Sequence, residues 1–188
     1  MPPVPTAAEA MSGRVALLGA TLLAGLSAGF FWTYEVSVTL GLAEVDDAAY
    51  VQTFQAINDT IKNPMFGPVF FGTLPLLLLA AGLNWRSSST VRRALLALAP
   101  LLFACCMAIT GTGNVPLNNE LAAVEPTSAE VVADARAEFE DDWNRLNLVR
   151  ALAAAGGFTA AAAAMSLAPG RFEASPFTIA GSHSGQTG

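Results

Sequence analysis

Four long blocks of apolar residues constrain the fold of this chain more than any other feature of the sequence. They cover residues 15–38, 64–85, 91–113 and 143–167. An α-helix rises 1.5 Å per residue, so about 20 residues match the ~30 Å hydrocarbon core of a bilayer. Only 13% of the 188 residues are charged, against about 25% in soluble domains. We therefore predict an all-α, four-helix transmembrane bundle that contacts membrane lipid.

The segments outside these blocks divide the chain into three parts. Residues 1–13 are rich in Pro and Ala and predict a disordered N-terminus, residues 14–168 form the membrane domain, and residues 169–188 predict a flexible tail. A cleaved signal peptide is the competing interpretation of the first block. Its apolar stretch is longer than the about 7–15 residues of a signal sequence, which favours an uncleaved span.

Basic residues are distributed unevenly between the loops. Five fall on one side of the predicted bundle, namely Arg14, Arg86, Arg92, Arg93 and Arg171. The two loops on the other side, residues 44–63 and 114–145, hold twelve acids and only three basic residues. Positively charged loops stay in the cytoplasm. We therefore expect a multi-pass protein of the cell membrane with both termini in the cytoplasm.

Both acidic loops carry a helical pattern. Between residues 46 and 62, Tyr50, Phe54 and Ile57 recur at helical spacing, which predicts an amphipathic helix. Residues 128–145 begin with a serine cap and continue with many acids, which predicts a second surface helix. The expected bundle thus has amphipathic helices in its two outer loops.

Polar side chains gather in the outer half of the predicted bundle. Glu35 lies near the outer end of the first span, and Arg150 lies about two turns into the fourth. Trp143, Asn147 and Arg150 are spaced so that they share one helix face. An ionisable side chain costs about 2.5–3.5 kcal/mol at the centre of a span. This cost favours a ligand pocket, which would lie between spans one, three and four.

A structural interpretation of the same residues stays open. The asparagines would cap helix ends, the aromatic residues would form an interfacial belt, and Glu35 would pair with Arg150 to fix the packing. The only histidine, His183, lies in the tail, so a histidine-based metal site or catalytic dyad in the core is excluded. Cys105 and Cys106 are adjacent on one helix and cannot bridge there. We expect no metal site.

Four segments of the chain together resemble a known family. They are FFWTYEVSVTLGL, FQAINDTIKNPMFGPVFFG, GNVPLNNEL and WNRLNLVR, and they occur in this order between Gly19 and Ala155. This order is similar to that of the DUF1772 family, the anthrone oxygenase-like membrane proteins. The resemblance implies a four-span bundle and the oxidation of anthrones to anthraquinones with dioxygen, without a cofactor such as a metal or a flavin.

The chemistry of the side chains at these positions indicates candidate site residues. Glu35 would act as the base that forms an electron-rich enolate, and Arg150, Asn147 and Asn114 would donate hydrogen bonds to the carbonyl and the developing anion. The substrate-binding candidates are Trp32, Tyr34, Asn58, Asn63, Phe66, Asn118 and Trp143. Members of the family often carry a histidine close to the segment that matches Asn147–Arg150, whereas in this chain Leu146 and Leu148 flank Asn147. Either Glu35 replaces this histidine or the chain does not catalyse the reaction.

Three functions fit these residues. The first is a cofactor-free oxygenase that acts on a flat aromatic or polyketide-type molecule from the membrane. The second is a non-catalytic module that binds a lipid or quinone-like ligand, or that scaffolds a second copy or another membrane protein. A transporter is the weakest, because four spans leave little room for alternating access. The acidic sequence indicates no nucleic-acid partner.

Overall fold

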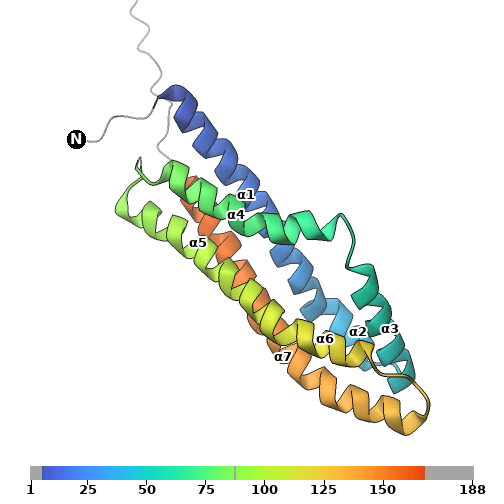
Figure 1. The fold of residues 1–188 in the computed structure, drawn as a ribbon. Coiled ribbons are helices and arrows are strands. Elements are labelled where there is room, and N and C mark those ends of the chain that lie inside the picture. Colours follow the sequence, from blue (N-terminus) through green and yellow to red (C-terminus); the bar gives the residue numbers. More distant parts are fainter. Residues whose placement is uncertain (1–5, 87, 168–188) are drawn as a thin grey trace, which may run out of the picture.

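The computed structural model describes residues 6–86 and 88–167, and every regular element in these ranges is helical. Four stretches in this part of the chain are long and apolar enough to cross a membrane: Ala7–Ala43, Phe66–Asn84, Thr90–Ala122 and Ala129–Ser166. They form one elongated bundle (Figure 1). The predicted all-α bundle with four membrane helices is thus confirmed. The predicted flexible tail, residues 169–188, lies outside the described residues.

The first span begins earlier than the sequence pattern indicated. It consists of α1 (Ala7–Thr33), the π-helical turn η1 (Tyr34–Val38) and α2 (Thr39–Ala43). The Thr6 hydroxyl accepts from the Glu9 amide at 3.3 Å, and the Glu9 carboxylate accepts from the Thr6 amide at 2.7 Å. This capping box starts a helix at residue 7. The prediction that the whole of residues 1–13 is disordered is therefore wrong for residues 7–13.

The predicted amphipathic helix of the first acidic loop is α3 (Asp47–Thr60). The carboxylate of Asp46 caps it by accepting from the Ala49 amide at 2.9 Å. α3 buries Tyr50, Val51 and Phe54 against the bundle. Next come α4 (Phe66–Asn84), α5 (Thr90–Ile109), the π-helical turn η2 (Thr110–Asn114) and α6 (Val115–Ala122).

The last element, α7 (Ala129–Ser166), merges two predicted elements into one helix of 38 residues. The surface helix expected at 128–145 and the span expected from 143 are continuous, because no proline interrupts the segment after the Ser128 cap. A helix of this length extends over about 57 Å, which is longer than the hydrocarbon core. Counting back about 20 residues from Ser166 therefore places Asn147 near the membrane boundary.

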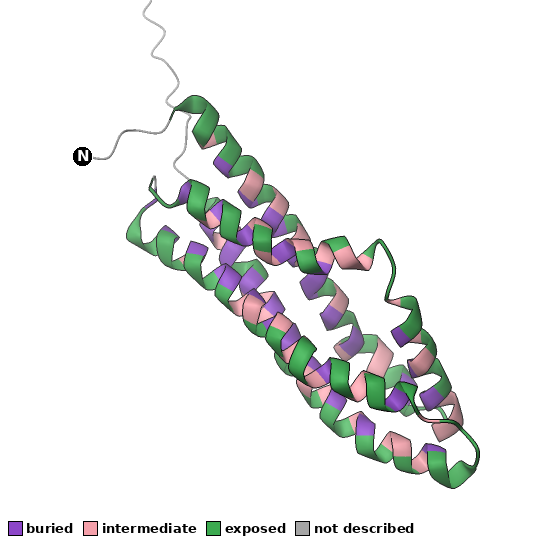
Figure 2. Ribbon diagram, in the orientation of Figure 1, coloured by how far each residue is buried: buried purple, intermediate pink, exposed green. Residues whose placement is uncertain are grey.

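Small residues allow the membrane helices to approach closely. Ala20, Ala154 and Ala161 are fully buried between helices. A Cβ atom added to Gly157 of α7 would lie 3.1 Å from the carbonyl oxygen of Ala99 in α5. Helices associate in lipid through such close packing, because lipid provides no hydrophobic driving force between them. Buried positions accordingly line the inner faces of the long helices (Figure 2).

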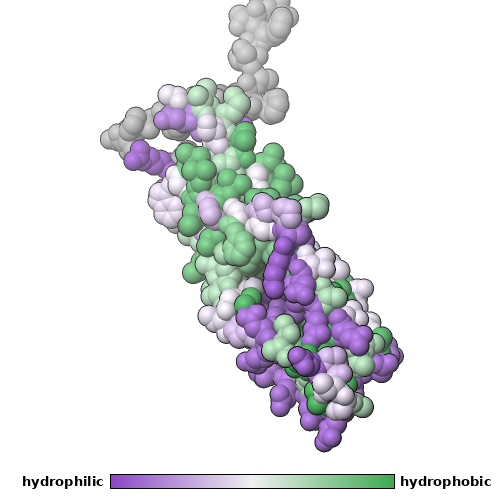
Figure 3. Space-filling model, turned by 45° about the vertical axis from the view of Figure 1, so that its right-hand side comes forward, coloured by the Kyte–Doolittle hydropathy of each residue, from purple (hydrophilic) through white to green (hydrophobic). Residues whose placement is uncertain are grey.

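The two ends of the bundle differ in charge. The end that holds Arg14, Arg86, Arg92 and Arg93 is called the arginine end, and the opposite end, with α3, α6 and the start of α7, is called the acidic end. Hydrophobic surface covers the middle of the molecule, and hydrophilic surface gathers at the acidic end (Figure 3). This division matches a helix bundle whose acidic end projects beyond the lipid.

At the arginine end, one buried side chain connects several spans. Arg92 is 2% exposed, and it donates to the carbonyl of Ala164 at 2.8 Å, to Ser88 Oγ at 2.7 Å and to Asn84 Oδ1 at 2.9 Å. Asn84 Nδ2 in turn donates to the carbonyl of Gly13 at 2.8 Å. These bonds join all four spans and satisfy a guanidinium that would otherwise be costly to bury.

Candidate functional site

The amide of Asn147 is the centre of a polar cluster near the acidic end. Asn147 is fully buried, and its Nδ2 donates to Glu35 Oε1 of η1. Its Oδ1 accepts from Nε of Arg150 at 2.9 Å. Asn147 thus connects a carboxylate on the first span with a guanidinium on the fourth. We call Glu35, Asn114, Trp143, Asn147 and Arg150 the polar cluster.

Arg150 is held by aromatic rings as well as by Asn147. Its side chain is 5% exposed, and its Cζ lies 4.6 Å from the ring centre of Phe31 and 5.0 Å from that of Trp143. Such cation–π contacts stabilise a desolvated guanidinium. Its terminal nitrogens make no hydrogen bond to any residue in the described ranges. Arg150 therefore keeps donors that could bind a carbonyl or an oxyanion.

Asn114 and Asn118 bring the third span into the cluster. Asn114 is fully buried, and its Nδ2 donates to the carbonyl of Trp143 at 3.3 Å. The Asn114 Oδ1 atom is buried and has no hydrogen-bond partner among the described residues. The Asn118 Oδ1 atom accepts from the indole N–H of Trp143 at 2.7 Å. An unpartnered buried amide oxygen is uncommon in native proteins and calls for a reason.

Two π-helical turns carry residues of the cluster. Glu35 belongs to η1 on the first span, and Asn114 belongs to η2 on the third. In η1 the Thr39 hydroxyl donates to the carbonyl of Tyr34 at 2.8 Å, and in η2 the Thr110 hydroxyl donates to the carbonyl of Cys106, also at 2.8 Å. Single π-turns inside α-helices occur frequently at functional sites. Both lie at the same end of the bundle as the polar cluster.

An open pocket of about 720 Å³ lies beside the cluster. Its lining includes Leu26, Phe30, Tyr34, Ile57, Phe66 and Val69. We call it the lateral pocket. It lies between the first span, α3 and the start of α4, rather than between spans one, three and four as expected. The reason is that α3 packs on α7 and leaves a space between its other side and α4.

Tyr34 is the residue that the lateral pocket shares with the surroundings of the polar cluster. It lines the pocket and is 7% exposed. Its ring centre lies 5.4 Å from that of Phe30 and also 5.4 Å from that of Trp143. Trp143 contacts Arg150, so a continuous row of rings leads from the pocket to the guanidinium.

The other substrate-binding candidates lie in different places. Phe66 lines the lateral pocket and packs on Phe30 at 5.1 Å between ring centres. Asn63 also lines it, but its Oδ1 accepts from the amides of Met65 and Phe66 and so caps α4. Asn58 is 8% exposed, and its Nδ2 has no partner in the described part of the chain. Trp32 is 46% exposed on the outside of the bundle.

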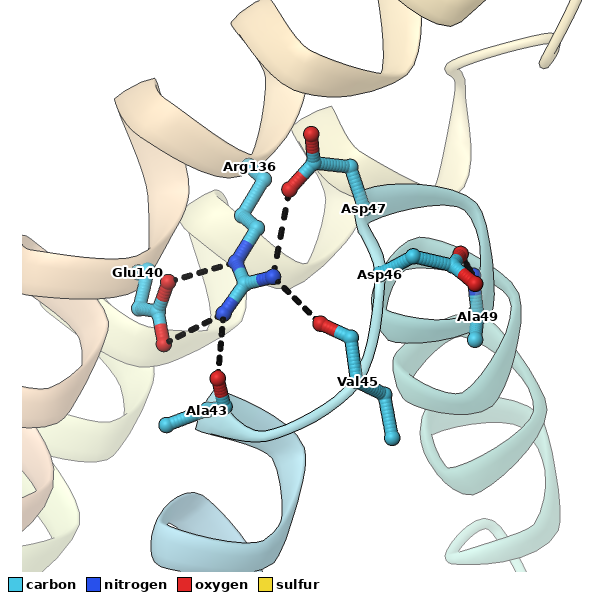
Figure 4. Close-up of polar contacts among 7 residues, drawn as sticks. All are labelled: Ala43, Val45, Asp46, Asp47, Ala49, Arg136 and Glu140. Atoms are coloured by element: carbon cyan, nitrogen blue, oxygen red, sulfur yellow. Dashed lines mark hydrogen bonds and ion pairs between the residues drawn. The ribbon is translucent and has the colours of Figure 1, made fainter.

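Arg136 connects the helices and loops at the acidic end. The Arg136 side chain donates to both carboxylate oxygens of Glu140, to Asp47 Oδ1 at 3.1 Å, and to the carbonyls of Ala43 and Val45 (Figure 4). Its guanidinium also lies 4.5 Å from the ring centre of Tyr50. Burial raises the pKa of Tyr50 above its usual range, so this phenol stays neutral. These contacts fix the segment between α2 and α3 to α7.

Comparison with family models gives one informative match. A model of the anthrone oxygenase family matches residues 54–160, which is more than half of the chain. The chain belongs to the anthrone oxygenase family. This is the DUF1772 family that the sequence motifs resemble. Comparison with curated proteins gave no match, and neither did comparison with solved structures.

For this anthrone oxygenase family member, the matched range includes Asn114, Asn147 and Arg150 but begins after Glu35. Phe30 and Phe31 were not among the site residues predicted from the sequence. Phe31 lies four residues before Glu35, so helical spacing alone could have placed it on the same face. The π-turns were not predicted either, because Thr39 and Thr110 give no distinctive local signal. Among the described residues, no three His, Cys, Asp or Glu side chains come together as a metal site.

Proposed function

We propose that this protein oxidises a flat aromatic or polyketide-type molecule with dioxygen, at the polar cluster and the lateral pocket. The observation that supports the proposal is the contact of the half-buried Glu35 with the buried Asn147, which in turn contacts the buried Arg150. This arrangement offers one carboxylate as a base and a guanidinium with free donors. Family membership supports the same reaction class.

In the proposed reaction, a CH₂ group flanked by aromatic rings and activated by a carbonyl loses a proton to Glu35. The enolate transfers one electron to dioxygen, and the resulting superoxide and carbon radical combine to a peroxide. The peroxide anion takes up the proton held by Glu35 and becomes a hydroperoxide. Loss of the second proton from the same carbon to Glu35 then breaks the O–O bond and releases hydroxide, which takes up that proton to form water. The sum converts CH₂ and O₂ into C=O and H₂O. Arg150 would stabilise the anionic oxygen atoms, because preorganised donors act most strongly where charge develops.

The test is to follow oxygen uptake and quinone absorbance with an anthrone and the protein in lipid nanodiscs. General-base catalysis contributes about 10²–10⁴ in rate, so Glu35→Gln should lose most of the activity. Glu138→Gln, an exposed acid on α7, is the matched control and should keep it. Equal rates in wild type, in Glu35→Gln and in empty nanodiscs would remove the oxygenase proposal for this substrate.

A second candidate is a non-catalytic module that binds a lipid or quinone-like ligand. One specific observation favours it: the lining of the lateral pocket includes none of the catalytic candidates Glu35, Asn114, Asn147 and Arg150. Saturable binding of a quinone without any oxygen uptake from its reduced form would support this candidate over the enzyme.

For the orientation, we propose that both termini and the arginine end face the cytoplasm, in the cell membrane. The arginines of this end support the assignment, since positive charge beside a span determines its orientation. The polar cluster would then lie in the outer leaflet.

A further inference from the structure

The lateral pocket is placed for entry from the lipid rather than from water. Leu26 and Met65, on two of its three walls, are 61% and 83% exposed. Both lie on spans, or directly beside one, where exposed apolar side chains contact lipid. The volume of about 720 Å³ lies within the roughly 300–1,000 Å³ of small-molecule sites. A molecule dissolved in the bilayer can therefore reach this pocket sideways.

The aromatic lining favours a flat ligand. Phe30, Tyr34 and Phe66 surround the pocket with three rings from two spans. Phe66 also stacks on Phe70, with an interplanar angle of 15° and 5.4 Å between ring centres. Aromatic walls gain more from a ring system than from a flexible acyl chain, because offset stacking adds to the buried area.

The polar end of the ligand would have its partners beyond Tyr34. Arg150 has unused donors, and Asn114 Oδ1 is a buried acceptor without a partner in the described ranges. One row of rings, Tyr34 followed by Trp143, connects the lateral pocket to this guanidinium. Tyr34 begins the π-turn η1, and the carbonyl of Tyr34 takes bonds from both the amide and the hydroxyl of Thr39.

We propose that a flat, largely apolar ligand with one carbonyl or phenol oxygen enters from the lipid through the lateral pocket, and that Tyr34 is the gate to the polar cluster. The Tyr34 ring turns aside, the ligand takes its place against Trp143, and its oxygen binds Arg150. Tyr34 is a positioning and gating residue here, and it takes no part in proton transfer. This inference rests on the proposed function in assigning one ligand to both sites.

The native tryptophans allow a direct binding experiment. Trp32→Phe with Trp85→Phe leaves Trp143 as the only tryptophan, and Trp143 is 2% exposed. Anthraquinone, a flat acceptor that partitions into lipid, is titrated into nanodiscs while Trp143 fluorescence is followed. Saturable quenching is the expected result. Quenching that rises only linearly with the probe indicates collision from the lipid and would overturn the proposal.

A blocked pocket tests the route. Ala56→Phe with Thr60→Phe adds two rings to the pocket wall formed by α3, and should abolish saturable quenching. Gln52→Phe adds a ring to α3 outside the lateral pocket and should leave it unchanged. Both substituted positions of the blocked variant are exposed, so the fold is expected to tolerate them. Unchanged saturable quenching in the blocked variant would show that the ligand takes another route.

Separate measurements test the role of Tyr34 as a gate and the identity of the ligand in the pocket. Tyr34→Ala should speed the onset of quenching several-fold over wild type, whereas Tyr34→Phe should restore the wild-type rate because it keeps the ring. Equal onset rates in Tyr34→Ala and Tyr34→Phe would remove the gate. Lipids brominated along the acyl chain provide the remaining control. If they quench Trp143 and anthraquinone does not displace them, the pocket holds lipid and the proposed ligand class is wrong.

These experiments test the lateral route and the oxygenase proposal independently of each other. If the wild type shows saturable quenching that the blocked variant loses, but no oxygen uptake, the lateral route is supported and the oxygenase proposal is rejected. If the blocked variant still takes up oxygen, the oxygenase proposal is supported and the lateral route is rejected.

Discussion

Glu35 and Arg150 are connected through the amide of Asn147 and not by a direct contact. The Asn147 Nδ2 donates to Glu35 Oε1, and the Asn147 Oδ1 accepts from Arg150 Nε at 2.9 Å. Within the described residues no ion pair joins the two charged groups. A carboxylate and a guanidinium that do not neutralise each other directly keep free atoms for a ligand. This arrangement makes Asn147 the first residue to test.

Asn147→Leu should destabilise the protein and disconnect the two charged groups. Leucine has a similar volume but no hydrogen-bonding atoms, so each buried group left without a partner costs about 1–3 kcal/mol. Thermal unfolding in nanodiscs measures the loss. Leu148→Ala, on the exposed side of α7, is the control and should change the unfolding temperature little. An Asn147→Leu protein as stable as wild type would contradict the bridging role.

Arg136→Ala should loosen the acidic end without unfolding the membrane helices. The variant removes the bonds that hold Asp47 and the carbonyls of Ala43 and Val45 to α7. Loss of these partners should lower local stability by about 1–3 kcal/mol. Hydrogen exchange should rise in residues 44–60 and stay unchanged in α4 and α5.

Arg136→Lys serves as the control for charge. Lysine keeps the positive charge but lacks the planar fork that reaches several acceptors at once. We expect exchange rates near those of Arg136→Ala. Rates equal to wild type would mean that charge alone fastens the segment.

Arg92→Gln should destabilise the arginine end by about 1–3 kcal/mol, because Asn84 Oδ1 and the carbonyl of Ala164 lose their buried donor. Arg86→Gln removes the same charge from the same end, but at an exposed position. Guanidinium or thermal unfolding of the two variants in parallel measures the difference. Equal losses of stability in the two variants would mean that Arg92 contributes only through its charge and not through its hydrogen bonds.

Gly157→Ala should destabilise the contact between α5 and α7. The added Cβ would lie 3.1 Å from the backbone oxygen of Ala99, which cannot move without shifting the helix, and such overpacking costs about 1–3 kcal/mol. Gly156→Ala meets only the end of the Leu102 side chain, at 3.0 Å, and that side chain can rotate away. Its unfolding temperature should match or exceed that of wild type. The opposite ranking of the two variants would contradict this packing.

A membrane-impermeant maleimide should label Glu125→Cys on intact cells and should not label Arg86→Cys, in a chain with Cys105 and Cys106 replaced by alanine. Glu125 lies at the acidic end and Arg86 at the arginine end. This result is expected because positive charge stays in the cytoplasm. Labelling of Arg86→Cys alone would reverse the proposed orientation.

The sequence by itself determined the class of fold. Long apolar blocks fix four membrane helices, since each block must span the lipid and satisfy its own backbone. The spacing of Tyr50 and Phe54 likewise predicted α3, and the spacing of Trp143, Asn147 and Arg150 predicted their shared face. The helical segment 7–13 and the continuity of α7 were misjudged, although the Thr6–Glu9 capping box and the absence of a proline were visible in the sequence.

Only the tertiary structure decided how these elements form a site. Periodicity states which face of a helix a residue occupies, but not which atom of another helix meets it. The bridge through Asn147, the rings of Phe31 and Trp143 around Arg150, and the lateral pocket beside α3 all depend on how separate helices pack. The π-turns at Glu35 and Asn114 depend on packing too, because a π-turn is costly in isolation and persists only where neighbouring groups hold it.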